Sequence, residues 1–163
     1  MPSDDAYVFT LPMKVRDYEV DSEGIVNNAI YLHYFEHTRH EFCTMAGLSF
    51  RRMRELGMAP VVSEISVRYI TPLGLGESMD SMLSLSRRGP RFIFRQWIVN
   101  ERGQTVADAT VTVVNMLNGR PTRGDEFAAA FSRYLTSCPS PPSRNADDAR
   151  RRTDGLQNGV CLH

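Results

Sequence analysis

Apolar and polar residues alternate along the second half of the chain, as they do in strands with one buried face. The alternation is clearest in SMDSMLSLS, from Ser78 to Ser86. The predicted strands are Ala59–Ile70, Ser78–Ser86, Arg91–Asn100 and Gln104–Leu117. Turn-forming residues separate them, including Gly89-Pro90 and Asn118-Gly119. Because the connections are short, we expect the four strands to form an antiparallel sheet.

A helical period appears earlier in the chain. Residues from Asn28 to Gly47 are apolar on more than one stripe, which predicts a helix of about five turns that is buried on most of its sides. Three weaker segments surround it: a strand at Tyr7–Arg16, a short helix at Phe50–Leu56 and an amphipathic helix at Asp125–Leu135. We therefore predict an α+β fold, in which one curved antiparallel sheet wraps around one long central helix.

Composition divides the 163 residues into a single domain at 1–136 and a tail at 137–163. The tail is rich in Pro, Ser, Asp and Arg, so we expect it to be mostly disordered. Lys plus Arg and Asp plus Glu both number 19, which gives no reason to expect a nucleic-acid partner, and no apolar stretch is long enough to span a membrane. Cys43, Cys138 and Cys161 have no pairing-like spacing, which fits a reducing cytoplasm, and Cys43 is expected to be a buried structural thiol.

Four acidic residues occupy every second position just before the predicted helix: Asp17, Glu19, Asp21 and Glu23. Alternate acids on an extended segment often form a solvated face, and we favour this interpretation for Asp17 and Glu23. Asp21 differs because it lies beside Gly24, where the chain must turn. Its carboxylate could cap the free amides of the first helical turn, or it could do catalysis near the positive end of the helix dipole. Spacing favours the cap, and it favours caps over substrate contacts for the Asn27-Asn28 pair as well.

Two other clusters carry candidate chemistry. His33 and His37, within HYFEH, share one face of the predicted helix and match a short zinc-peptidase pattern. The sequence that follows offers no helix for a third ligand, so we favour packed or solvent-facing histidines. Arg87, Arg88 and Arg91 surround a tight turn, and their spacing does not choose between a solvated hairpin tip and a site for phosphates.

The stretch VRDYEVDSEGIVNNAIYLHYFEHTRHEF resembles the opening motif of the hotdog-fold thioesterases of the 4-hydroxybenzoyl-CoA thioesterase type. The matching residues are Arg16, Glu19, Asp21, Gly24, Val26, Asn27, Asn28, Tyr31 and Glu36. The later SEISVRYITPL is similar to the branch that contains the plant acyl-lipid thioesterases, and the resemblance extends from about Val8 to Tyr134. Many relatives have Asp at the position of Glu19 and a histidine near Ile25-Val26, but neither departure removes the carboxylate of Asp21.

The resemblance implies hydrolysis of an acyl thioester, either acyl-CoA or acyl-carrier protein, without a metal or organic cofactor. It makes Asp21 the catalytic carboxylate, as nucleophile or as general base, and it makes Asn28 the residue whose amide polarises the thioester carbonyl. The substrate-binding residues that it implies are Gly24, Asn27, Tyr31, Arg87, Arg88 and Arg91, with the arginines on coenzyme A phosphates.

The resemblance also implies a homodimer or a homotetramer with the acyl site between subunits. The alternative is a hotdog module that binds acyl thioesters without cleaving them. A hotdog dehydratase or hydratase ranks below it, because such enzymes pair an acid with a histidine at the start of the helix, and no histidine lies between Asp21 and Asn28.

Overall fold

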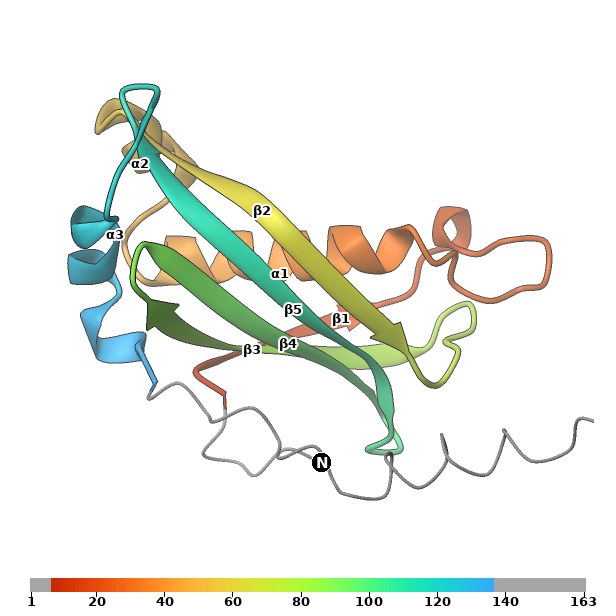
Figure 1. The fold of residues 1–163 in the computed structure, drawn as a ribbon. Helices are drawn as coiled ribbons and strands as arrows, with labels where there is room; N and C mark the ends of the chain where they lie inside the picture. The colour runs from red at the N-terminus through yellow and green to blue at the C-terminus, as the bar shows by residue number, and fades with distance from the viewer. Residues whose placement is uncertain (1–6, 137–163) are drawn as a thin grey trace, which may run out of the picture.

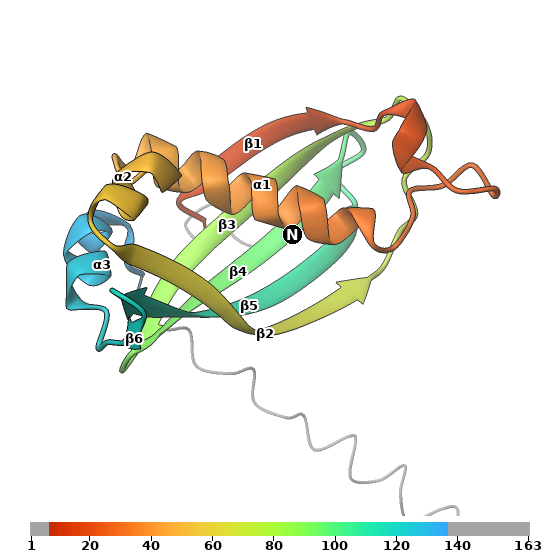
Figure 2. The same cartoon turned by 90° about the horizontal axis from the view of Figure 1, so that it is seen from above.

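A computed structural model describes residues 7–136, which form one curved sheet around one long helix (Figure 1, Figure 2). The strands are β1 (Phe9–Lys14), β2 (Met58–Tyr69), β3 (Ser78–Arg88), β4 (Arg91–Asn100), β5 (Thr105–Leu117) and β6 (Arg120–Pro121). The helices are α1 (Ile30–Met45), α2 (Phe50–Glu55) and α3 (Asp125–Ala130), with 3-10 turns η2 (Asp17–Glu19) and η3 (Ser132–Tyr134). The predicted α+β architecture is confirmed, while the predicted tail at 137–163 lies outside the described residues.

The sheet is antiparallel throughout, in the order β1-β3-β4-β5-β2, with the short β6 beside the end of β5. The strand β2 does not pair with β3, which follows it in the chain. The connection between them instead binds the acidic segment, because Val26 N–H donates to the Leu73 carbonyl at 2.9 Å and Ile25 bridges to Gly74. As a result β1 and β2 are the two edges of the sheet.

The inner side of α1 fills the concave face of the sheet, as the two views show (Figure 2). Phe35 and Phe42 are fully buried there. A polar network crosses the same interface: the hydroxyls of Thr38 and Ser81 are hydrogen-bonded at 2.7 Å, and Gln96 Nε2 donates to the Phe35 carbonyl at 2.9 Å. The opposite side of α1 is open, so the prediction of a helix buried on most sides is wrong.

The termini of the described chain lie together on the β1 side of the sheet. Val8 N–H donates to the Leu83 carbonyl at 2.8 Å, and Thr136 N–H donates to the Leu85 carbonyl at 2.8 Å. The last described residues therefore continue the line of β1 along β3. Within residues 7–136, no helix combines the length and the apolarity needed to cross a membrane.

Candidate active site

Asp21 lies on a small hairpin that projects beyond the start of α1 (Figure 1). Val20 and Val26 form an antiparallel bridge, and Asp21 N–H donates to the Ile25 carbonyl at 2.9 Å. The turn closes with Gly24, whose N–H donates to the Asp21 carbonyl at 3.0 Å and whose φ of +76° is accessible to glycine at little cost. Asp21 is consequently exposed to solvent on a loop with a defined backbone.

The cap interpretation of Asp21 is wrong. Its Oδ1 accepts a hydrogen bond of 2.9 Å from the N–H of Glu23, two residues away within the loop. Asn27 orders the turn just before α1, because its Oδ1 accepts from the N–H of Ala29 at 2.9 Å. The helix begins two residues later than predicted, at Ile30. The N-cap position of α1 is Ala29, which makes no side-chain cap bond, so the cap interpretation is wrong for Asn27-Asn28 as well. The carboxylate of Asp21 is exposed to solvent.

Glu19 anchors this hairpin to α1, a role that sequence reasoning missed. The residue is only 6% exposed, and Oε2 accepts a 2.6 Å hydrogen bond from the Tyr34 hydroxyl and a 2.8 Å bond from the Arg16 N–H. Its carbonyl accepts from the Asn27 N–H at 3.0 Å. Burial of the ring is the main cause that raises the pKa of Tyr34, and the nearby Glu19 carboxylate raises it further. The Tyr34 hydroxyl therefore stays protonated and donates its hydrogen bond to Glu19. Asp17 and Glu23 are exposed, as predicted.

Replacing Glu19 by alanine should lower the free energy of unfolding by about 1–3 kcal/mol, because it leaves the buried Tyr34 hydroxyl and Arg16 amide without their acceptor. Urea denaturation measures the change. Asp17→Ala is the matched control, since Asp17 lies in the same 3-10 turn but is exposed, and it should stay within about 0.5 kcal/mol of the parent protein. Equal stabilities for the two variants would contradict the anchoring role of Glu19.

Asn28 lies between the hairpin and the first turn of α1. Its carbonyl accepts a 2.9 Å hydrogen bond from the hydroxyl of Tyr69, at the end of β2. Within residues 7–136, no acceptor for the Asn28 N–H is found. This amide therefore remains available to a ligand near the positive end of the helix dipole.

Tyr31 is the second residue of α1, and its side chain packs under the first helical turn. It is buried, and its ring lies 5.3 Å from that of Tyr69 and 6.0 Å from that of Tyr34, centroid to centroid. Burial raises the pKa of the Tyr31 hydroxyl. Sequence reasoning had no local signal for Tyr69, because 41 residues separate it from Asn28.

The arginine turn lies at the other end of the molecule. It connects β3 to β4 beside α3, whereas Asp21 precedes α1, and the 16 residues of α1 span about 24 Å. Arg87 is engaged within the protein: it donates to the carbonyls of Gly89 and Arg123, both at 2.8 Å, and pairs with Asp125 at 2.6 Å. Arg88 and Arg91 are exposed. A single chain therefore brings Asp21, Gly24, Asn27, Asn28 and Tyr31 together but does not bring the arginine turn to them.

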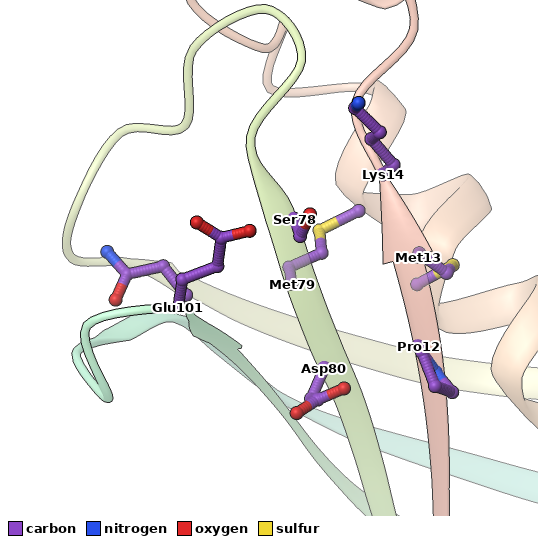
Figure 3. Close-up of a pocket in the computed structure, with 8 residues that line it drawn as sticks. Pro12, Met13, Lys14, Ser78, Met79, Asp80 and Glu101 are labelled. Carbon is purple, nitrogen blue, oxygen red and sulfur yellow. The ribbon is translucent and has the colours of Figure 1, made fainter.

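Two clefts open beside β1. One, of about 520 Å³, lies between β1 and α1 and includes Arg16, Glu19, Tyr34, His33 and His37. The other, of about 390 Å³, lies between β1 and β3, with Glu101 of the β4–β5 turn at its side (Figure 3). Its lining is Pro12, Met13, Lys14, Ser78, Met79, Asp80, Asn100 and Glu101. Asp21 lines neither cleft. A pocket that encloses a substrate at Asp21 therefore requires residues other than those that line these two clefts.

Two of the three histidines of α1 have ordinary helical partners. His37 lies 4.0 Å from Glu41 and His40 lies 3.7 Å from Glu36, both at a spacing of four residues. In the described part of the chain, no group of three or more His, Cys, Asp or Glu side chains could hold a metal ion. Cys43 is a buried free thiol, and burial raises its pKa to about 12, so it is a weak nucleophile at neutral pH.

A family model described as the thioesterase-like superfamily matches residues 15–139. The chain belongs to this superfamily. A solved structure of a hypothetical protein from Aquifex aeolicus superposes with a TM-score of 0.71 at 27% identity, covering 76% of this chain and 98% of that one. The predicted hotdog fold of the thioesterases is thereby confirmed.

Two relatives within the superfamily carry names that describe an activity. The chain is 35% identical over 120 residues to the chloroplastic acyl-acyl carrier protein thioesterase ATL2 of Arabidopsis thaliana, covering 69% of this chain and 62% of that one. It is 36% identical over 104 residues to the long-chain acyl-CoA thioesterase FadM of Escherichia coli, covering 63% of this chain and 78% of that one. The chain spans less than two thirds of ATL2, and its match to the related ATL3 spans 34% of that protein.

Proposed function

We propose that this protein hydrolyses an acyl thioester, acyl-CoA or acyl-carrier protein, to the free acid and the thiol. The observation that carries the proposal is the exposed carboxylate of Asp21, on a hairpin fixed by Glu19, next to the available N–H of Asn28. The names of ATL2 and FadM support the reaction class. The two names differ in the thiol carrier, so both carriers are included in the proposal.

The proposed reaction uses two groups of the protein. The thioester carbonyl accepts from the Asn28 N–H, and the amides and dipole of the first turn of α1 stabilise the oxyanion that forms. Asp21 either takes a proton from the attacking water or attacks the carbonyl itself, giving an anhydride that water then opens. In both routes the carbon–sulfur bond breaks, the thiolate takes a proton, and the oxygen of one water molecule ends in the acid. No step requires a metal or an organic cofactor.

We infer that the active form is at least a homodimer built across β2. Within residues 7–136 this strand pairs only with β5, so in that part of the chain its other edge is open along 12 residues. Val62, Ile65 and Tyr69 face the concave side of the sheet, yet they are 46%, 40% and 47% exposed. Leu32 on the open side of α1 is 40% exposed and adds to this apolar area. A second copy paired antiparallel along β2 would satisfy the edge and cover these side chains.

Cys43 is a free thiol, which supports a reducing compartment, and we propose the cytoplasm. The compartment is independent of the chemistry proposed for Asp21. The two Arabidopsis relatives are described as chloroplastic, and cell fractionation followed by immunodetection tests the proposed compartment.

The reaction is tested by profiling the purified protein against acyl-CoA and acyl-carrier-protein substrates of graded chain length, with thiol release as the readout. We expect saturable turnover of at least one series. Measurable binding of acyl thioesters without thiol release at any chain length would replace the hydrolase with the non-catalytic binding module.

A further inference from the structure

The charges of the described chain are segregated along its long axis. Nine arginines lie at the end formed by α2, the β3–β4 turn, β6 and α3: Arg51, Arg52, Arg54, Arg87, Arg88, Arg91, Arg120, Arg123 and Arg133. Three carboxylates lie among them, and two are already paired, Glu55 with Arg51 and Arg52 and Asp125 with Arg87. The end that carries Asp21 is acidic on balance: Asp17, Glu23, Glu77, Asp80 and Glu101 also lie there, against the basic residues Lys14, Arg16 and Arg102. The full sequence has a net charge of zero, yet within residues 7–136 one end is basic and the other is acidic.

The basic end is one continuous surface. Asn118 N–H donates to the Gly57 carbonyl at 2.9 Å, which joins the end of α2 to the β5–β6 turn. The bond from Arg87 to the Arg123 carbonyl joins the β3–β4 turn to the segment before α3. We define the arginine surface as Arg51, Arg52, Arg54, Arg91, Arg120 and Arg123, all of which are exposed.

Pairing of two subunits along β2 would place the arginine surface of one subunit beside the active site of the other. The strand β2 begins at Met58, directly after α2 and its Arg54, and ends at Tyr69, which is bonded to Asn28. In an antiparallel pair related by a twofold axis, the Met58 end of one strand lies beside the Tyr69 end of the other. The arginine surface of one subunit then stands next to Asp21 of its partner.

The geometry points to an acyl carrier protein that docks on the arginine surface of one subunit and presents its thioester to Asp21 of the other. This inference rests on the proposed hydrolysis and on the β2 dimer. The end that carries Asp21 is acidic and would repel an acidic carrier, so the attraction must come from the partner. The arginines are exposed and spread over α2, β4, β6 and the segment before α3, which suits a protein surface better than the concave site that a small ligand needs.

The docking role is tested by reversing one charge. Arg54→Glu should lower kcat/KM for an acyl-carrier protein about tenfold and leave kcat/KM for the CoA ester of the same acid within about twofold. Arg102→Glu is the matched control, because Arg102 is exposed in the β4–β5 turn at the acidic end; it should change neither value. Equal losses with both substrates, or no loss with either, would overturn the docking role.

The use of two subunits is tested with hybrid dimers. One subunit carries Asp21→Asn, the other carries Arg54→Glu and Arg120→Glu, and different affinity tags isolate the hybrid. Because one site of the two then combines an intact arginine surface with an intact Asp21, the hybrid should regain about half of the parent activity on the acyl-carrier protein. Activity no higher than that of the two parent variants would place the docking surface and Asp21 in the same subunit and overturn the inference.

The two proposals fail in different ways. A parent protein that turns over neither CoA nor carrier-protein esters refutes the hydrolase itself. A parent protein that turns over CoA esters but not carrier-protein esters refutes only the docking inference.

Discussion

Asp21→Asn is expected to lower kcat for thioester hydrolysis by roughly 10²–10⁴-fold, because the amide can neither accept a proton from water nor attack the carbonyl. Its Oδ1 can still accept the bond from the Glu23 N–H, so the loop backbone should be preserved. Steady-state thiol release measures kcat, and thermal unfolding checks that the fold is intact.

Asp17→Asn provides the matched control, since it removes one negative charge from the same acidic segment at an exposed position. It should retain nearly full activity. If Asp17→Asn and Asp21→Asn lose activity equally, the effect comes from the charge of the segment and Asp21 has no special role. If Asp21→Asn keeps parental activity, the catalytic carboxylate lies elsewhere.

Ile65→Lys is expected to abolish the dimer and, with it, turnover. Ile65 pairs with the buried Val111 and faces the concave side of β2, where the second subunit would cover it. An ammonium buried there twice per dimer, without a counter-charge, costs several kcal/mol, so the dimer dissociation constant should rise by at least about 100-fold. Sedimentation velocity over a concentration series measures the constant.

Val61→Lys is the control for the same strand. Val61 is also a β-branched residue and is 46% exposed, but it lies on the opposite face of the sheet, paired with Val114. The lysine would remain in solvent, and the dimer should persist.

A monomeric parent protein that is fully active would exclude a site shared between subunits.

The sequence predicts the strands and the central helix well because each buries one face, and this requirement is written into local periodicity. Alternation in Ser78–Ser86 places β3, for example, within two residues of its observed end at Arg88. The pairing of strands that are distant in the chain leaves no comparable pattern in the local sequence. The placement of β2 beside β5 rather than β3 is one case, and the short pairing of Arg120–Pro121 with the end of β5 is another.

The site shows the same division. Glycine and asparagine before α1 predict the turn, and Gly24 distinguishes Asp21 from the other acids, but no local pattern distinguishes Glu19 from Asp17 and Glu23. Glu19 is buried because Tyr34, 15 residues away, offers it a hydroxyl, and no local pattern announces that bond. Asp21 could not be separated from a helix cap by spacing, since the decision depends on Asn27 Oδ1 holding the Ala29 amide instead.

The hydrogen bond from Thr136 to Leu85 has a practical consequence for protein engineering. It fixes the exit of the chain on the β1 margin of the sheet, on the far side from β2. A fluorescent protein or a second enzyme fused after residue 136 would thus be attached away from the strand on which self-association is proposed. Fusions at this point should make suitable reporters for subunit exchange, because the label lies at the β1 edge of the sheet and the proposed subunit contact lies at the β2 edge.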